Sequence, residues 1–188
     1  MANDKDRITL GSGKLYIKEH VTTDSFIDVK TTIDDMKVDA NLLGYINGGA
    51  TLDYKGTFYT AEDDLGYVSK TVLTKEEITL KSGIMTWNGQ TLKNLCSTAR
   101  VTDDAVNGLR VVKIGGMNNT DGKLYTILFV HEDTIDGNVY VLIVGNNQAG
   151  FSFSFATGKE TVIDAEFKAS PFDSEGTKLI YAEDIPTV

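Results

Sequence analysis

Alternation between apolar and polar side chains is the dominant pattern along this chain. It is clearest over residues 50–55, 151–155 and 163–169, where every second residue is apolar. Successive side chains of a strand point to opposite faces of a sheet, so a period of two predicts half-buried strands. A helix would spread the same residues around its whole surface. The pattern therefore predicts a mostly β chain.

Turn dipeptides separate the apolar runs in the second half of the chain. They are Asn107-Gly108, Asp121-Gly122 and Asp136-Gly137. The first residue of each tolerates positive φ and the glycine adopts it without steric cost, as tight hairpin turns require. From residue 109 onward the order is strand, turn, strand, turn. We therefore expect antiparallel strands that form a β-sandwich or barrel.

One segment has the spacing of a helix instead. Its apolar residues, at i, i+3, i+4 and i+7, are Leu92, Leu95, Cys96 and Ala99. Asn88 stands where an N-cap is expected, and Trp87 precedes it as the first half of a hydrophobic staple. This predicts one flanking helix over residues 87–99. A weaker helical turn is expected to begin at Thr32, with Asp35 as an acidic capping partner.

Two expected strands, residues 124–130 and 139–144, are apolar on both faces. Antiparallel sheets usually leave one face in water, so a second layer must cover these strands. Two interpretations are open. Either the one predicted helix covers them completely, or a neighbouring subunit covers the remainder, because large exposed apolar patches usually mark interfaces.

A long polar stretch, residues 57–67, lies between two expected strands and carries Glu62, Asp63 and Asp64 in succession. Such a loop is most often a solvated excursion at the tip of a hairpin. Aromatic residues flank the acidic run: Phe58, Tyr59 and Tyr67. They suggest a second interpretation, in which the stretch is a projecting arm that contacts another molecule.

Composition and charge narrow the class of protein. The chain has 188 residues, of which 41% are hydrophobic and 24% charged, as expected for one globular domain spanning residues 1–188. The net charge of −9 argues against a general binder of nucleic acid or anionic membrane, since both would be repelled. A single cysteine excludes an internal disulfide. The charged residues 1–7 predict an N-terminal arm rather than a signal peptide, and no apolar run is long enough for a membrane-spanning helix.

Residues suited to catalysis or metal binding form no recognisable pattern. His20 and His131 lack a second ligand at metal-binding spacing, and residues 131–133 are expected to be a solvated strand end. Cys96 lies on the apolar side of the expected helix, where a small buried residue is more common than a reactive thiol. Neither a G-x-S-x-G nor a G-x-x-x-x-G-K-[ST] motif occurs. We therefore expect no enzyme activity, no cofactor and no metal.

The order of these features resembles the tail tube proteins, or major tail proteins, of tailed phages. The resemblance begins with Gly-Tyr-Ile-Asn-Gly-Gly-Ala-Thr-Leu-Asp-Tyr at residues 44–54. It continues through a long hairpin, the expected helix and a β-rich second half. The closing segments 162–169 and 177–183, joined by a turn through Pro171 to Gly176, are similar to the last strands of that family. The resemblance covers most of residues 44–185.

The resemblance implies a β-sandwich flanked by a helix, assembled into hexameric rings that stack into a hollow tube. The sheets of adjacent subunits would join into one inner barrel, through which DNA would pass without specific binding. The protein would then be a structural component of the virion tail, assembled in the host cytoplasm. Its partners would be copies of itself, a tape-measure protein and a terminator protein, with no membrane contact.

Two groups of residues acquire roles from the resemblance. Ring-to-ring contact is expected from the loop 57–67, through Phe58, Tyr59, Glu62, Asp63, Asp64, Leu65 and Tyr67. The lumen is expected to be lined by Asp53, Glu77, Asp164 and Glu166. Their carboxylates would repel the phosphates of passing DNA. Without a tube, the same four side chains simply face bulk water.

The main alternative is a monomeric carbohydrate-binding or adhesion β-sandwich. Such modules usually cluster exposed aromatic residues, whereas the tyrosines of this chain are scattered. Within the phage interpretation, a tailocin tube or a tail terminator would share the fold. An enzyme is the third possibility and is supported only by abundant carboxylates.

Overall fold

The computed structural model describes residues 11–22 and 26–185, and the expected N-terminal arm 1–7 lies outside these residues. Within the described part, nine strands and two α-helices follow in the order β1 (Lys14–Glu19), α1 (Val29–Met36), β2 (Leu42–Glu62), β3 (Ser69–Ile84), α2 (Gly89–Leu95), β4 (Arg100–Asp104), β5 (Leu109–Lys113), β6 (Tyr125–His131), β7 (Val139–Asn147), β8 (Ile163–Ala169) and β9 (Leu179–Glu183). The predicted mostly β, antiparallel class is confirmed. Two short helices are present where the sequence predicts one longer helix and a helical turn.

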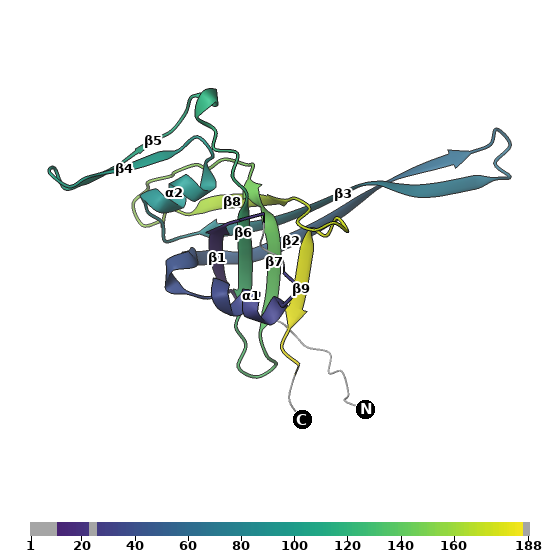
Figure 1. Ribbon diagram of the computed structural model, residues 1–188, viewed down its shortest axis with the longest axis horizontal. Helices are drawn as coiled ribbons and strands as arrows, with labels where there is room; N and C mark the ends of the chain where they lie inside the picture. Colours follow the sequence, from purple (N-terminus) through teal and green to yellow (C-terminus); the bar gives the residue numbers. More distant parts are fainter. Residues whose placement is uncertain (1–10, 23–25, 186–188) are drawn as a thin grey trace.

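Six of the strands close into a barrel. Hydrogen bonds link them in the order β6-β1-β2-β3-β8-β7, and β7 pairs back to β6, with every pairing antiparallel. Strand β9 extends the sheet beside β7. In Figure 1 the barrel is the body of the molecule, from which two hairpins project. Closure removes the sheet edges that would otherwise be free along the body.

Strand β7 changes partner part-way along its length. Residues 139–143 pair with β9, whereas residues 145–147 pair with β8. Gly145 stands at the change, where a Cβ atom would overlap the backbone carbonyl of Lys168. A residue without a side chain lets the two backbones approach this closely. Closure of the barrel between β7 and β8 therefore depends on Gly145.

The interior of the barrel is the main hydrophobic core. Each barrel strand contributes to it, and the side chains that are at most 1% exposed include Leu15, Leu80, Ile127, Ile143 and Phe167. In β8 the alternation read from the sequence is reproduced directly, with Ile163 buried and Asp164 exposed. Burying one such aliphatic or aromatic side chain contributes about 1.5–3 kcal/mol.

A second core lies between α1 and the outer surface of the barrel. Ile33 and Met36 of α1 are both less than 5% exposed. They pack with a cluster from β1, β6 and β7, namely Tyr16, Leu128, Val130, Tyr140 and Leu142. The strands that are apolar on both faces are thus covered on both sides by their own chain. Both interpretations are therefore wrong: α1 covers the outer face of these strands, rather than the predicted helix or a neighbouring subunit.

Helix α1 begins earlier than the sequence predicts. The carboxylate of Asp28 accepts hydrogen bonds from the backbone N–H and the hydroxyl of Thr31, at 3.1 and 2.8 Å. Asp28 is therefore the N-cap, and Thr32 lies within the first turn. The sequence conceals this start because Thr31 occupies the position where a capping box has Glu or Gln.

Helix α2 is capped as predicted but is shorter. The side chain of Asn88 accepts hydrogen bonds from the backbone N–H groups of Gln90 and Thr91, at 2.8 and 3.2 Å. The helix ends at Leu95, because the backbone of Cys96 is extended, with φ of −138°. Ala99 is buried even though it lies outside the helix. Burial of the predicted apolar positions is therefore shared between the helix and the segment that follows.

The alternating residues 151–155 form a loop rather than the predicted strand. The next strand, β8, already pairs with β3 on one side and β7 on the other, so the barrel offers this segment no edge. The aromatic rings stack instead on Trp87 and on one another, with centroids 4.6 to 5.9 Å apart, in the order Trp87, Phe153, then Phe151 and Phe155.

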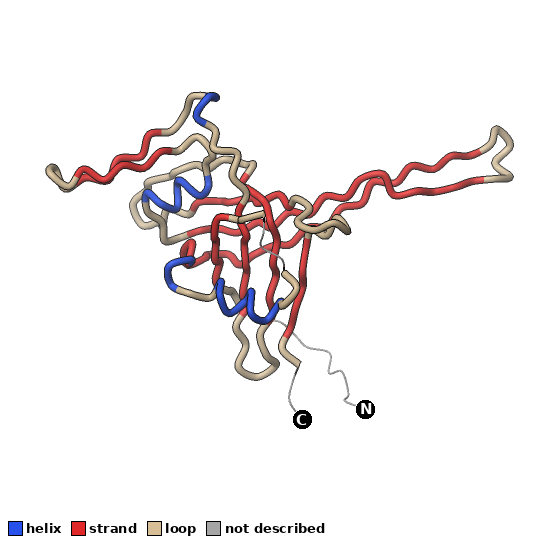
Figure 2. The backbone as a smooth tube through the Cα atoms, viewed as in Figure 1, coloured by secondary structure: helices blue, strands red, loops and turns tan. Residues whose placement is uncertain are grey.

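Two hairpins leave the body in opposite directions (Figures 1 and 2). Strands β2 and β3 extend well beyond the barrel, and β4 and β5 form a separate two-stranded sheet on the other side. Residues 57–62 belong to β2, and only residues 63–68 form an irregular turn. The predicted boundaries of the loop, 57–67, are therefore wrong, because residues 57–62 are part of β2 and pair with β3.

Candidate self-association surface

The long arm, defined as residues 54–78, is a two-stranded ribbon. Strand β1 pairs with β2 only as far as Tyr45, and β8 pairs with β3 only from Thr79 onward. In the described part of the chain, β2 and β3 pair with no third strand beyond these points. Both edges of the arm therefore keep open backbone N–H and C=O groups. An isolated two-stranded hairpin is only marginally stable in water, and free edges can pair with another chain.

One face of the long arm carries an apolar patch and continues the inward side of the barrel. Leu52 and Tyr54 are followed by Phe58, which stands directly opposite Leu73 of β3. Phe58 is 63% and Leu73 is 44% exposed. A Cβ atom on Gly56 would come within 3.1 Å of both the Phe58 ring and Leu73. The two side chains therefore converge over the glycine and form one exposed apolar surface.

A β-bulge at Thr74 determines that Phe58 stands opposite Leu73. The register shifts by one residue between Thr57 and Phe58, and the Thr74 hydroxyl donates a hydrogen bond to the carbonyl oxygen of Thr57 at 3.0 Å. Without the extra residue, Phe58 would stand opposite Thr74. Leu73 would then turn to the other face, because a slip of one residue exchanges the two faces of a strand.

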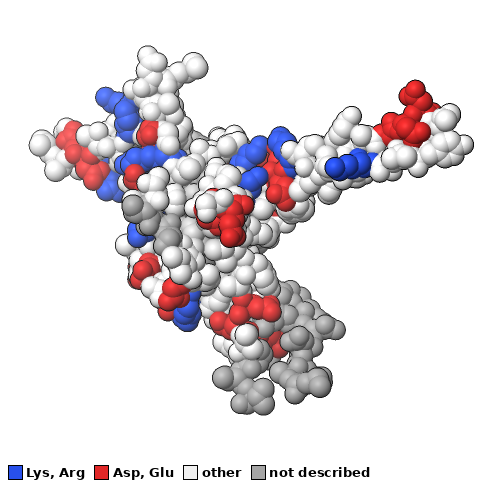
Figure 3. Space-filling view, turned by 45° about the vertical axis from the view of Figure 1, so that its right-hand side comes forward, with Lys and Arg blue, Asp and Glu red and all other residues white. Residues whose placement is uncertain are grey.

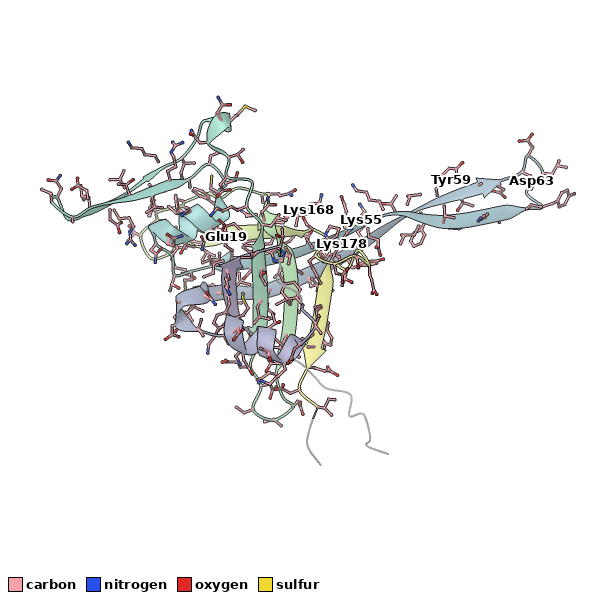
Figure 4. All side chains as sticks on the ribbon, in the orientation of Figure 1. Glu19, Lys55, Tyr59, Asp63, Lys168 and Lys178 are labelled. Atoms are coloured by element: carbon pink, nitrogen blue, oxygen red, sulfur yellow. The ribbon has the colours of Figure 1, made fainter. Side chains whose placement is uncertain are left out.

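Asp63 builds the turn at the outer end of the long arm, where Figure 4 shows it. Its carboxylate accepts hydrogen bonds from the backbone N–H of Val68 at 2.6 Å and of Leu65 at 3.4 Å. These backbone donors, Val68 foremost, lower the pKa of Asp63. Gly66 supplies the positive φ of 71° that the turn requires. Asp63 is thus engaged within the turn and differs in role from the contact residues predicted beside it.

The other side chains at the tip extend into solvent. Leu65, Tyr67 and Val68 are 75%, 84% and 70% exposed. Glu62 and Asp64 are exposed as well. The structure therefore brings the predicted contact residues together on one projecting arm, and all but one of them have side chains available to a partner.

The four predicted lumen residues share one surface of the barrel. The register of β2, β3 and β8 places all four on the outward side: Asp53, Glu77, Asp164 and Glu166. On β8, Asp164 and Glu166 alternate with buried residues. On β2 the neighbours of Asp53, Leu52 and Tyr54, are themselves exposed. Lys81 lies among them, with its Nζ 2.9 Å from a carboxylate oxygen of Asp53 and 4.0 Å from one of Glu166. Basic and acidic side chains are interleaved where the long arm joins the body (Figure 3).

Glu77 has the most perturbed carboxylate of this surface. It lies between two lysines, with its carboxylate oxygen 2.6 Å from Nζ of Lys75 and 3.2 Å from Nζ of Lys168. Hydrogen bonds from these lysines lower the pKa of Glu77 to about 2. With Asp53 and Glu77 both paired, the surface is not the uniformly acidic lining that the sequence predicts.

A shallow pocket of about 370 Å³ opens on this surface. Gly48 and Gly49, both with positive φ, form a bulge of β2 at its rim. Lys81, Asp164 and Glu166 are its charged residues, and its lining includes no histidine or cysteine. Among residues 11–22 and 26–185, no three His, Cys, Asp or Glu side chains converge as a metal site requires.

His131 and Cys96, two of the residues considered for chemistry, are held by contacts within the fold. His131 is only 4% exposed, and its Nδ1 lies 2.7 Å from the carbonyl oxygen of Ser12. The prediction of a solvated strand end is therefore wrong for His131, because β6 stays paired with β7 as far as this residue. Cys96 is half-buried directly after α2, with Sγ 3.4 Å from the hydroxyl of Thr98.

A second projection, which the sequence pattern does not predict, is the short arm, defined as residues 100–113. It packs on α2 through Val112. A Cβ atom on Gly89 would come within 3.0 Å of Val112, so the glycine permits the close approach. Several apolar side chains of the arm are exposed: Val106, Leu109 and Val111. The dipeptide Asn107-Gly108 indicates the hairpin, but nothing in the local pattern shows that it leaves the barrel.

Fold and surface together define a closed antiparallel barrel with two projecting β-hairpin arms, both of which carry exposed apolar side chains. Comparison of the chain with models of known protein families finds no match, and comparison with curated proteins finds none either. Neither helix in the described part of the chain is long and apolar enough to cross a membrane.

Proposed function

We propose that this chain is a structural subunit that assembles with copies of itself into stacked hexameric rings, forming the tail tube of a phage. In this proposal the long arm makes the contacts between rings, and the charged outer face of β2, β3 and β8 lines the lumen. DNA passes through the tube without specific binding. Tape-measure and terminator proteins are the other partners, and the assembled protein belongs to the virion tail.

The exposed apolar surface of the long arm is the observation that carries the proposal. Phe58, Leu73 and Tyr67 lie on a ribbon that has no core of its own. Such a ribbon gains stability by burying apolar area against a neighbour, at about 25 cal/mol per Å². Its free edges can also extend the sheet of a neighbouring subunit. The strands that are apolar on both faces add no support, since α1 covers them.

The charged outer face suits a passage for DNA, although not through the acidic repulsion that the sequence predicts. Lysines offset Asp53 and Glu77, so this surface has no strong field of either sign. A wall without excess positive charge does not retain phosphates. The net charge of −9 opposes adsorption of DNA elsewhere on the subunit. Both features favour transit without binding.

Assembly is the property that tests the proposal. Purified protein would be concentrated, imaged by negative-stain electron microscopy and sized by light scattering, and we expect rings or tubes. The variant Leu65→Ser/Tyr67→Ser should fold normally by circular dichroism but stack poorly. Ile135→Ser, at an 88% exposed position in the β6–β7 turn, is the matched control. Monomers under all conditions would rule out the tube, and normal stacking of the double variant would exclude the tip as the contact.

A monomeric carbohydrate-binding or adhesion module is the second candidate. The stacked row of Trp87, Phe153 and Phe155 favours it, because Phe155 is 77% exposed and aromatic faces can stack on sugar rings. Light scattering and binding to immobilised polysaccharides separate the two candidates. A stable monomer that binds a polysaccharide, with binding lost in Phe155→Ala, would favour this module over the tube.

A further inference from the structure

The tip of the long arm carries acidic side chains without partners. Glu62, Asp63 and Asp64 stand in succession, and Figure 3 shows this acidic cluster at the outer end of the arm. Asp63 is engaged by backbone donors. Neither Glu62 nor Asp64 forms an ion pair with any residue of 11–22 or 26–185. Leu65 and Tyr67 are exposed beside them, and we call these two side chains the apolar knob. The tip thus combines the apolar knob with two negative charges that have no ion-pair partner among the described residues.

The short arm has the complementary character on its outer face. Arg100 of β4 and Lys113 of β5 stand directly opposite each other, and both are exposed. In the described part of the chain neither has an ion-pair partner. Two like charges directly opposite each other are unfavourable in an antiparallel pair, and an anionic partner would relieve the repulsion. Leu109 and Val111, 60% and 38% exposed, lie farther along the same face.

The other charged groups of the short arm do not neutralise this face. Asp104, opposite Leu109, is the carboxylate on the same face, and its oxygens accept hydrogen bonds from the backbone and side chain of Asn107 at 3.1 and 2.8 Å. Asp103 and Arg110 form an ion pair at 2.6 Å on the opposite face, which is directed toward α2. Arg100 and Lys113 therefore remain a local positive site on an acidic protein.

The two arms point away from each other along the longest axis of the molecule (Figure 1). The tip of the long arm therefore cannot reach the short arm of its own copy. A contact between the tip of one copy and the short arm of another joins two different surfaces. Such a contact can repeat around a ring or along a stack, and two antiparallel copies can also make it reciprocally as a closed dimer.

We propose that the tip of the long arm docks on the outer face of the short arm of another copy. The apolar knob packs against Leu109 and Val111, while the two free carboxylates pair with Arg100 and Lys113. Opposite charges steer the encounter and fix its orientation, and added salt weakens it. This inference rests on the proposed self-assembly and names the surface that receives the long arm.

Charge exchange between the two surfaces is the first test. The variants Glu62→Lys/Asp64→Lys and Arg100→Glu/Lys113→Glu each place like charges face to face. We expect each to raise the critical concentration for assembly by about tenfold or more. A chain with all four substitutions again pairs opposite charges and should assemble within about threefold of the unmodified protein. Exchange of the exposed Lys30 and Asp34 on α1 is the control and should change nothing.

The outcomes separate this inference from the proposed function. If the unmodified protein assembles and the Arg100→Glu/Lys113→Glu variant assembles equally well, the docking is wrong while self-assembly stands. If both double variants fail and the fourfold variant does not recover, the two surfaces do not contact each other and the docking is again wrong. If the unmodified protein never assembles, both proposals fail.

Cysteine cross-linking tests the contact in a second way. In a Cys96→Ala background, Tyr67→Cys is introduced in one preparation and Val111→Cys in another. Mild oxidation of the mixture should give a disulfide-linked dimer in severalfold excess over either preparation alone. Ile135→Cys replaces Val111→Cys as the control for random collision. A mixture that cross-links no better than this control would overturn the docking.

Discussion

Phe58 and Leu73 stand directly opposite each other on the long arm, and both are exposed. They lie just past the β-bulge, on the side away from the barrel. A cross-strand pair of this kind contributes about 0.2–1 kcal/mol, which does not hold a long hairpin in place by itself. The pair therefore matters more to an intermolecular contact than to the folding of the subunit.

Replacing both residues should separate assembly from stability. In Phe58→Ser/Leu73→Ser we expect the free energy of unfolding to fall by less than about 1 kcal/mol, because the pair is outside both cores. Assembly, measured by sedimentation, should be lost. The control is Thr60→Ala/Thr71→Ala, which alters the next pair on the same face, where the hydroxyls are 2.8 Å apart. A large loss of stability with normal assembly would contradict this role.

Glu77 should make stability depend on pH in the acid range. Its folded-state pKa of about 2 is below the unfolded value of about 4.3, so the native state favours the charged carboxylate. Its contribution is present at neutral pH and is lost as pH falls from about 4 toward 2. The effect is small because the ion pairs are solvated.

Urea unfolding of Glu77→Gln at several pH values measures this contribution. The variant should be less stable than the unmodified protein at pH 7, and the difference should shrink as the pH falls through the acid range. Lys75→Met/Lys168→Met should remove the same pH-dependent component, because the two lysines cause the shift. A difference that is constant with pH would show that the ion pairs are not its source.

Gly145 should not tolerate a side chain. In Gly145→Ala the new Cβ meets the backbone of Lys168 rather than a movable side chain, so β7 and β8 must separate. We expect a loss of about 2–4 kcal/mol in the free energy of unfolding, measured by chemical denaturation. The neighbouring Asn146→Ala should cost less than about 1 kcal/mol. Equal effects of the two substitutions would mean that the close approach is unimportant.

Met36 tests the finding that α1 covers the outer face of β6 and β7. Met36→Ala opens a cavity against Leu128, Val130 and Leu142 and should cost about 2–5 kcal/mol. It should also increase binding of a hydrophobic dye. Asp35→Ala, exposed on the same helix, should stay within about 0.5 kcal/mol. A negligible cost for Met36→Ala would indicate that the helix is not what shields these strands.

Where local chemistry decides a feature, it could be predicted from the sequence. The alternation over residues 163–169 predicts β8, because each residue type matches the face on which it lies. Asn88 is recognisable as a cap because its side chain needs only the backbone N–H groups that follow it. Asp164 and Glu166 likewise face the same side because they lie two residues apart on one strand, whereas the register of β2, β3 and β8 places Asp53 and Glu77 with them.

Features that depend on which edges are occupied could not be predicted in this way. Residues 151–155 have a strand pattern but become a loop, because β8 already has a partner on each side. Lys75 lies two residues from Glu77 on the same strand, but Lys168 comes from β8, and only the register of β3 and β8 brings it to Glu77. The helix that covers the two-faced strands precedes them by some ninety residues, as the positions of Met36 and Leu128 show.

By itself, the sequence determined the β class, the alternation of faces along single strands, the cap of α2 and the acidic balance, because each can be read without knowing which strands pair. Only the tertiary structure decided that β2 and β3 outgrow the barrel, that β4 and β5 leave it, and that the acidic tip and the basic short arm point away from each other. Barrel closure is the physical reason. Once six strands pair in a ring, β9 still joins beside β7, but the parts of β2 and β3 that run past β1 and β8 have no further neighbour in the described chain and extend into solvent.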